Sequence, residues 1–324
     1  MNTRPFQPFQ YLRLSLTDRC NFRCRYCLPE LNQEFHPREN TLSLPDWKVL
    51  LPMLRGIGIR KVRLTGGEPT LHPGLLELVA LLAESGFEET ALTTNGFRLG
   101  KLAPEFKRLG LNRVNVHLDS LKPETFDHAT QTKGQLERVL AGIRLAKSLG
   151  LSPKVNVVLM RGLNDGEAID FMDFSAKEGV EVRFIELMPT GTNEDYFKEY
   201  FIPVMEIKRR LQDRFSLEPF ERDPLGGPSR RFKIKGSNAK VGFIGSSCEG
   251  FCDGCQRLRL TSEGVVKRCL FEPGGLELQP MLRQGLLPEQ LNESILSFLS
   301  NKWTFNPHVA GPVKEAFPLA RIGG

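Results

Sequence analysis

The chain lacks the long apolar stretch that a membrane-spanning helix needs. Its longest unbroken apolar run covers residues 78–83, whereas a membrane span takes about 20 apolar residues. The first ten residues contain two prolines and no apolar segment, so they do not resemble a secretory signal peptide. These absences lead us to expect a cytoplasmic protein that does not enter a membrane.

A large charge excess is absent as well. The chain has 44 Lys and Arg against 38 Asp and Glu, a formal net charge of +6 over 324 residues. This excess is too small for a polybasic nucleic-acid binder, but it is compatible with an anionic small molecule. We therefore expect no nucleic-acid partner. Apolar residues make up 40% and charged residues 25% of the chain, which indicates a globular protein with an ordinary core.

Cysteine is scarce and unevenly distributed. The chain has seven cysteines, and none lies between Cys27 and Cys248. In a reducing compartment, cysteines act as metal ligands or catalytic groups before they form disulfides. The spacing therefore predicts two metal centres, one from each end of the chain. The two groups are Cys20, Cys24 and Cys27, and Cys248, Cys252, Cys255 and Cys269.

Short apolar or β-branched runs alternate with segments of helical period from residue 11 to about residue 188. Six β/α units in a row predict an α/β fold with a parallel sheet. Six is fewer than the eight of a closed barrel, so we expect a partial (β/α)6 barrel of the TIM type, with ligands at the carboxyl ends of its strands. The expected strands cover residues 11–16, 61–65, 89–94, 113–118, 153–159 and 181–187, with helices at 75–85, 134–149 and 167–178.

The pattern changes after about residue 203. Residues 218–237 mix proline, glycine and charge, and strand-like segments follow at 240–244 and 257–260. We predict a core domain over residues 1–214 and a smaller α+β cluster-binding module over residues 215–324, whose last eight residues should be irregular.

The N-terminal cysteines follow the first expected strand with the spacing C-x3-C-x2-C. Three thiolates on one loop can hold three irons of a four-iron cluster and leave the fourth iron open. Zinc is the alternative, but structural zinc takes four ligands, and His36 lies nine residues beyond Cys27. The spacing, with Tyr26 before the last cysteine, resembles the radical S-adenosylmethionine (SAM) superfamily. The resemblance implies that SAM binds the open iron and is cleaved to a 5′-deoxyadenosyl radical, which abstracts a substrate hydrogen.

Gly66-Gly67-Glu68-Pro69 follows the second expected strand and is similar to the GGEP motif of that superfamily. By itself it could be an ordinary turn, since glycine suits both a turn and a close approach of backbone to a ligand. Met188, likewise, would by itself be read as a core residue. The resemblance implies SAM contacts at Tyr26, Gly66, Gly67, Glu68, His117 and Met188.

The C-terminal cysteines leave two interpretations open. Cys252, Cys255 and Cys269 have the spacing C-x2-C-x13-C, and Cys248 could complete a four-thiolate zinc site. Alternatively, the three cysteines hold a second four-iron cluster, and Cys248 is a spare thiol.

The sequence around these cysteines resembles the GTP 3′,8-cyclase (molybdenum cofactor biosynthesis protein A) family, and the similarity extends along nearly the whole chain. Arg257 and Arg259 are two apart on an expected strand, so they face the same side and suit a triphosphate, although a solvated basic edge strand would show the same pattern. The resemblance implies two [4Fe–4S] clusters, the second against the guanine base. It also implies GTP contacts at Arg13, Arg63, Thr94, Lys154, Arg257, Leu258 and Arg259, and Lys61 and Arg183 are further basic candidates for this site.

The chain ends in Gly323-Gly324, the same pair that reaches the active site in this family. The resemblance implies a radical SAM lyase that closes the GTP ribose C3′ onto guanine C8, giving 3′,8-cyclo-7,8-dihydro-GTP, the first step of molybdopterin biosynthesis. It implies an electron donor such as a flavodoxin or ferredoxin and a downstream cyclic pyranopterin monophosphate synthase, and it leaves a homodimer open. The catalytic roles fall on Arg13, Arg257, Arg259, Gly323 and Gly324.

Two positions depart from the family pattern. Gln256 stands where the family usually has Asn, and His117 stands where it usually has Ser. The competing functions are another radical SAM enzyme with an auxiliary cluster, such as a peptide-maturing one, and a zinc-binding RNA or interaction module.

Overall fold

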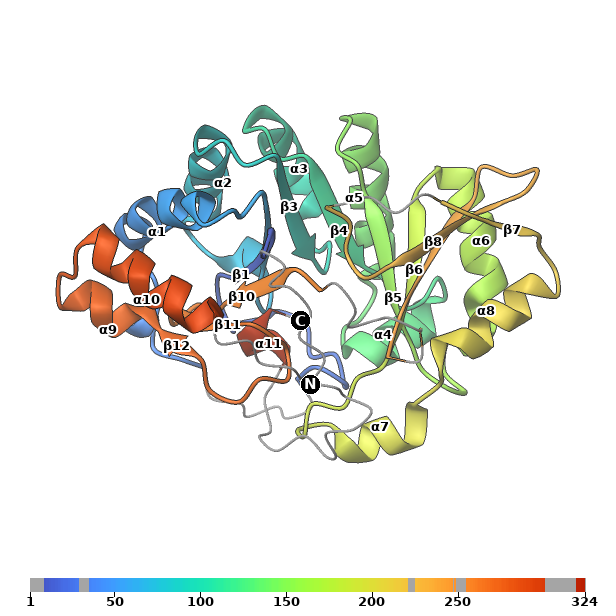
Figure 1. Ribbon diagram of the computed structural model, residues 1–324. Helices are drawn as coiled ribbons and strands as arrows, with labels where there is room; N and C mark the ends of the chain where they lie inside the picture. The colour runs from blue at the N-terminus through green and yellow to red at the C-terminus, as the bar shows by residue number, and fades with distance from the viewer. Residues whose placement is uncertain are drawn as a thin grey trace.

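A computed structural model describes residues 9–28, 35–220, 225–246, 248, 255–300 and 319–323. It shows a curved sheet with helices along its outer side (Figure 1). All six expected strands are present, each within about one residue of the expected bounds, so the α/β fold with six parallel strands is confirmed. The strands are β1 (Tyr11–Ser15), β2 (Lys61–Thr65), β3 (Glu89–Thr94), β4 (Arg113–His117), β5 (Lys154–Leu159) and β6 (Glu181–Glu186). The helices among and after them are α1 (Leu44–Gly56), α2 (Leu75–Glu84), α3 (Leu99–Arg108), α4 (Pro123–Thr130), α5 (Leu136–Ser148), α6 (Ala168–Glu178), α7 (Glu194–Tyr200) and α8 (Val204–Gln212).

Local signals explain where these helices begin and end. The Asp46 carboxylate accepts a 2.7 Å hydrogen bond from the backbone N–H of Ser43 at the start of α1, which satisfies a donor that the first helical turn leaves open. Helix α6 ends at Gly179, whose φ of +61° lies in the left-handed region that glycine reaches without strain.

The C-terminal strands extend both edges of the same sheet. Strand β10 pairs in parallel with β1, and β9 pairs in parallel with β6. The full order is β12-β11-β10-β1-β2-β3-β4-β5-β6-β9-β8-β7. The division of the chain at residue 214 remains a prediction. The added strands are β7 (Leu217–Pro219), β8 (Arg230–Ile234), β9 (Lys240–Ile244), β10 (Arg257–Leu260), β11 (Val265–Lys267) and β12 (Leu276–Glu277).

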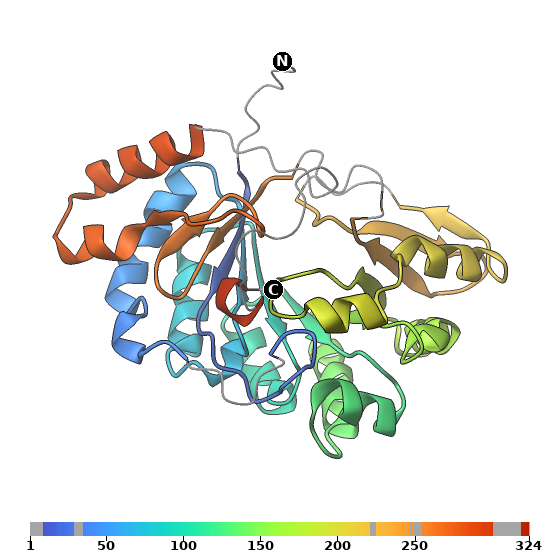
Figure 2. The ribbon, with the colours of Figure 1, turned by 90° about the horizontal axis from the view of Figure 1, so that it is seen from below.

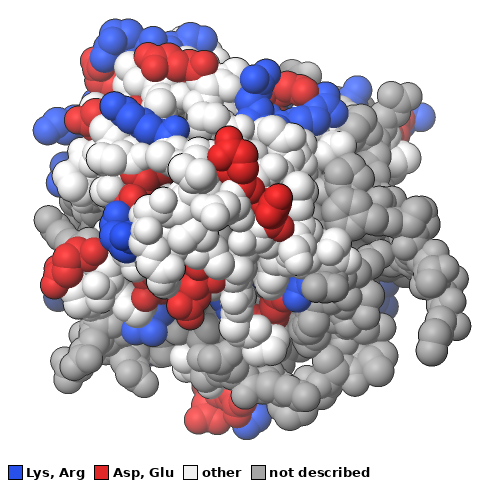
Figure 3. All heavy atoms as spheres, turned by 60° about the vertical axis from the view of Figure 1, so that its left-hand side comes forward, with Lys and Arg blue, Asp and Glu red and all other residues white. Residues whose placement is uncertain are grey.

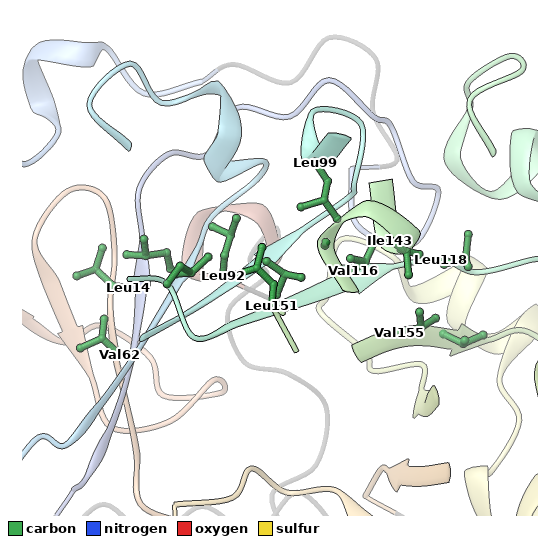
Figure 4. Packing of buried hydrophobic residues seen from close by; sticks show 14 of the residues in the cluster. Leu14, Val62, Leu92, Leu99, Val116, Leu118, Ile143, Leu151 and Val155 are labelled. Atoms are coloured by element: carbon green, nitrogen blue, oxygen red, sulfur yellow. The ribbon is translucent and has the colours of Figure 1, made fainter. Parts of the chain in front are cut away.

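The two faces of the sheet differ in chemistry because side chains alternate along each strand. On the outer face, Leu12 and Leu14 of β1 and Val62 of β2 are fully buried in the main hydrophobic core. Figure 4 shows Leu14, Val62 and Leu92 packed in this core, to which the helix residue Leu99 also belongs. The intervening residues of β1 and β2, among them Tyr11, Arg13 and Arg63, therefore face the concave side.

The C-terminal tail lies on this concave side. Helix α11 (Leu319–Ile322) is seen inside the curve of the sheet in Figure 2. The expectation of an irregular tail is wrong for these four residues, because Ala320 and Ile322 are buried and stabilise a helical turn. Helices α9 (Leu278–Arg283) and α10 (Pro288–Ser300) lie beside α1, where Arg283 pairs with Asp46 at 2.9 Å.

One face of the molecule carries mixed charge. On the face shown in Figure 3, Lys and Arg stand among Asp and Glu rather than in a field of one sign. No helix in the described part of the chain has both the length and the apolar character that crossing a membrane requires.

Candidate functional site

Cysteines from the two parts of the chain lie at opposite ends of the sheet strands. Cys20, Cys24 and Cys27 follow the carboxyl end of β1. Cys255 immediately precedes β10, which runs parallel to β1, so it lies at the amino ends of the strands. The antiparallel strand β11 returns the chain to that same end, where Cys269 follows. A ligand between the two groups would therefore lie along the concave face.

The N-terminal cysteines are partly buried, and their thiols are close enough to influence one another. Burial is the largest effect on the pKa of Cys24, and it raises that pKa well above the usual range, with further contributions from the neighbouring Cys20 and Cys27 thiols. Burial also raises the pKa of Cys20 to about 11. Such thiols are held as thiolates only beside strong positive charge, which the irons of a cluster supply. The donor set therefore fits a cluster.

A single-ion site is not found near these thiols. In residues 9–28, 35–220 and the other described segments, no three His, Cys, Asp or Glu side chains converge as a single metal ion needs. In a four-iron cluster the thiolates are bound to different irons, so they need not converge on one point.

The glycines of the Gly-Gly-Glu-Pro motif fasten the cysteine loop to β2. The Gly67 N–H donates a 2.6 Å hydrogen bond to the carbonyl of Thr17, and the Glu68 N–H donates a 2.7 Å bond to the carbonyl of Arg19. A Cβ at Gly66 would overlap the Thr17 carbonyl, and one at Gly67 would overlap that of Arg19. In the structure, the absence of side chains at these glycines lets their backbone approach the backbone of residues 17–19, just before Cys20.

Glu68 is buried and already saturated with hydrogen bonds. Its carboxylate accepts from the Thr70 N–H at 3.0 Å, the Thr94 hydroxyl at 2.8 Å and the Asn95 N–H at 2.7 Å. Burial raises its pKa, although these donors oppose the change. The Thr94 hydroxyl also accepts from the Gly96 N–H at 3.1 Å, so it serves the loop that follows β3.

A three-residue hydrogen-bonded group stands beside the cysteine loop. The Tyr26 hydroxyl donates to the buried Asp119 carboxylate at 2.9 Å and also contacts His117 Nε2. Burial lowers the pKa of His117, but the Asp119 carboxylate raises it by more. Met188 follows β6 at the same edge of the sheet, where its carbonyl accepts from Asn193 at 3.2 Å. Asp119 was missed in the sequence, although it lies just after β4, at the strand end where ligand-binding residues gather in such folds.

Two rows of polar side chains cross the concave face. Tyr11 of β1 stands in register with Lys61 of β2 and Arg257 of β10. Two residues further along, Arg13 stands in register with Arg63 and Arg259. A barrel interior is ordinarily filled with apolar side chains, so a concentration of cations there indicates an anionic ligand.

A second group of cations lies across β5 and β6. Glu181 pairs with Lys154 at 3.0 Å, with Arg183 at 2.7 Å and with Arg231 at 2.7 Å. Burial raises the pKa of Glu181, but the cations, Arg183 first, lower it by more, to about 2. Burial lowers the pKa of Lys154 to about 7, with Arg183 and Arg113 adding to the effect and Glu181 opposing it. Arg113 was another cation missed in the sequence.

Of the C-terminal cysteines, Cys255 contacts a cation of the concave face, whereas Cys248 lies in the core. Arg257 Nε donates a 3.1 Å hydrogen bond to Cys255 Sγ. Burial raises the pKa of Cys255, yet Arg257 lowers it by more, so this thiol ionises more readily than an ordinary cysteine. Cys248 is 3% exposed and packs in the core against Met205. Cys252 lies outside the described residues.

The C-terminal tail touches both halves of the site. Burial raises the pKa of the Cys27 thiol to about 12, although the backbone N–H of Ala320 donates a hydrogen bond to this thiol and opposes the change. Arg259 Nη1 donates to the carbonyls of Ile322 at 3.1 Å and Gly323 at 2.7 Å. A Cβ at Gly323 would overlap the Thr65 hydroxyl. Gly324 lies outside the described residues.

The structure thus brings the predicted cationic residues to one concave face and places the predicted SAM residues near the carboxyl ends of the strands, whereas two predicted GTP contacts are engaged elsewhere. Thr94 bonds to Glu68 and its own loop. The side chain of Leu258 points to the outer core, where it is fully buried beside its register partner Leu12. Lys61 lies on the concave face, paired with Glu89 at 2.9 Å.

Comparisons with known proteins agree with this arrangement. Residues 14–175 match the radical SAM superfamily model, and residues 180–305 match the model described as Molybdenum Cofactor Synthesis C. A GTP 3′,8-cyclase of Moorella thermoacetica is 40% identical over 316 residues, 97% of each chain. One from Geobacter sulfurreducens is 39% identical over 317 residues, 97% of this chain and 96% of its own.

A solved structure confirms the fold. SuiB of Streptococcus suis, crystallised with S-adenosylmethionine, superposes with a TM-score of 0.61 and 14% identity, over 84% of this chain and 64% of SuiB. At that identity the likeness shows the fold alone. The matches to both family models and to full-length relatives go further, and the chain belongs to the GTP 3′,8-cyclase family of the radical SAM superfamily.

Proposed function

We propose that this chain is a GTP 3′,8-cyclase that converts GTP to 3′,8-cyclo-7,8-dihydro-GTP. The observation that carries the proposal is the pair of side-chain rows across β10, β1 and β2, which supply five cations between thiol groups at opposite ends of the strands. A triphosphate is the part of GTP that needs such a surface, because guanidinium groups bind phosphate through paired, charge-assisted hydrogen bonds. The relatives that match nearly the whole chain carry the same enzyme name.

Two [4Fe–4S] clusters and SAM complete the proposed site. Cys20, Cys24 and Cys27 would hold the first cluster, and Cys252, Cys255 and Cys269 the second. When bound, SAM and the first cluster supply the abstraction of a hydrogen atom from the substrate ribose. Tyr26, Gly66, Gly67, Glu68, His117 and Met188 are the proposed SAM residues, of which the two glycines and Glu68 act by holding the cysteine loop in place.

The protein's own part is to bind and orient the nucleotide. Arg13, Arg63 and Arg257 neutralise the triphosphate along one side of the concave face, and Lys154 and Arg183 do so along the other. Arg257 also donates to the Cys255 thiol, so one residue links the phosphate-binding rows to the second cluster. Lys154 and Arg183 are buried and already paired with Glu181, so little reorganisation of these two side chains is needed when the nucleotide arrives.

The setting of the enzyme follows from this chemistry. The product enters molybdopterin biosynthesis through a cyclic pyranopterin monophosphate synthase, and a flavodoxin or ferredoxin supplies electrons. Clusters held by thiolates suit a reducing compartment, so we place the enzyme in the cytoplasm. A homodimer is compatible with this proposal but not required by it.

Turnover on GTP tests the proposal directly. The protein is reconstituted anaerobically and incubated with GTP, SAM and dithionite, and 5′-deoxyadenosine and the cyclised nucleotide are measured by mass spectrometry. We expect both products in equal amounts. If 5′-deoxyadenosine forms while GTP is not consumed, the substrate assignment is wrong. Tightly bound zinc without sulfide would overturn the cluster assignment as well.

A further inference from the structure

Tyr11 occupies the centre of the first row on the concave face. It is 4% exposed and stands in register between Lys61 and Arg257. The Lys61 ammonium and the Arg63 guanidinium each lie 5.2 Å from the centre of its ring. The ring thus presents its π-system to two cations, an arrangement that stabilises positive charge within about 6 Å.

The Tyr11 hydroxyl has no hydrogen-bond partner among the residues that the structure describes. Arg63 Nε is in the same condition. Leaving a buried polar group unsatisfied is costly, and tyrosine hydroxyls normally find a partner when buried. Two such groups in adjacent rows, among several cations, indicate that their partner is an anion that binds there.

The charges around Tyr11 favour hydrogen bonding to an anion. Burial raises its pKa, but Arg63, Arg13, Lys61 and Arg257 together lower it by more. A more acidic phenol is a stronger donor to a phosphate oxygen, and the same cations attract the phosphate.

We propose that Tyr11 is a substrate-binding residue whose hydroxyl donates a hydrogen bond to the polyphosphate of the nucleotide. This inference rests on the proposed function, because it assigns a role in the same GTP site. The ring has a second effect, since it separates Lys61 from Arg257 while no nucleotide is bound. Sequence reasoning does not identify this residue, because a tyrosine at the start of a strand is ordinary.

Tyr11→Phe tests the hydroxyl alone, because phenylalanine keeps the ring and its contacts with the cations. Binding of GTP, guanosine and inorganic tripolyphosphate to the reconstituted enzyme is measured by anaerobic equilibrium dialysis. We expect GTP and tripolyphosphate to bind at least about tenfold more weakly to the variant, since a hydrogen bond to a charged group contributes on that order. Guanosine binding should change less than about twofold on this account.

A matched control is Tyr200→Phe, which removes the same atom from α7 and should leave all three affinities unchanged. Equal GTP and tripolyphosphate affinities in wild type and Tyr11→Phe would overturn the inference. Failure of the proposed function gives a different result: wild type would not bind or consume GTP, while the tripolyphosphate comparison would still report on Tyr11.

A second measurement applies if Tyr11→Phe does not retain its iron. Wild-type protein is labelled with 3-fluorotyrosine, and three of the four resonances are assigned with Tyr26→Phe, Tyr196→Phe and Tyr200→Phe, so that the remaining one belongs to Tyr11. Tripolyphosphate should shift the Tyr11 signal and leave those of α7 in place. An unshifted Tyr11 signal at saturating tripolyphosphate contradicts the contact.

Discussion

Arg259 holds the carbonyl of Gly323 at 2.7 Å, so a guanidinium of the proposed phosphate-binding rows is bound to the C-terminal tail. The adjacent carbonyl of Ile322 accepts from the same nitrogen at 3.1 Å. At its other end, the tail donates to the thiol of Cys27. The tail therefore connects the cysteine loop to the phosphate-binding rows, and its position should affect both.

Gly323→Ala should lower cyclase activity at least tenfold. Gly323 has a φ of +70°, and a Cβ there would overlap the Thr65 hydroxyl, so the tail must leave its position. The measurement is cyclised nucleotide formed per minute, with iron content checked in parallel. Gly227→Ala is the control, because a Cβ there meets nothing within 4 Å. Unchanged activity in Gly323→Ala would show that the tail position does not matter.

GTP affinity should fall as the pH rises above 7. Lys154 has a pKa of about 7 because burial, Arg183 and Arg113 outweigh Glu181, so it loses its charge through this range. Bound triphosphate stabilises the charged lysine and raises its pKa, so binding takes up a proton. Between pH 7.5 and 8.5, where the terminal phosphate is already ionised, affinity should fall by an amount approaching tenfold.

Lys154→Met should bind GTP more weakly at pH 7 and lose most of this pH dependence. Lys198→Met on α7, where the side chain is 72% exposed, should keep it. Anaerobic equilibrium dialysis at several pH values measures both variants. If GTP affinity changes with pH equally in wild type and in Lys154→Met, the proton taken up on binding belongs to another group.

Glu181→Gln should destabilise the fold. The carboxylate is 5% exposed and pairs with three cations, two of them buried, so its loss leaves those charges uncompensated. Breaking a buried pair in this way costs about 3–5 kcal/mol. The thermal midpoint of unfolding should fall clearly, whereas Glu88→Gln, which breaks an exposed pair with Arg60, should leave it nearly unchanged. Equal midpoints in the two variants would refute this account.

Iron content should show that Cys255 is a cluster ligand and that Cys248 is not. With two four-iron clusters, wild type binds about eight irons per chain. Cys255→Ala should bind about half of that, whereas Cys248→Ala should keep about eight, because Cys248 packs in the core beside Met205. Iron loss in Cys248→Ala without a fall in the thermal midpoint would make Cys248 a ligand.

The sequence by itself determined the six parallel strands, the cysteine loop after the first of them, and the family. These are properties of short segments. Alternating Leu12, Arg13 and Leu14 specify a strand with two different faces, and the spacing from Cys20 to Cys27 is specific wherever it occurs. The pairing of Arg257 and Arg259 on one face also followed from their spacing alone.

Only the tertiary structure decided which distant segments these strands and loops contact. Pairing of β10 with β1 and of β9 with β6 joins residues far apart in the chain, and register between distant parallel strands is not encoded by local periodicity. That pairing places Tyr11 between Lys61 and Arg257, and folding of the tail brings Gly323 to Arg259. Neither contact leaves a local signal, because each depends on burial that only the assembled sheet provides.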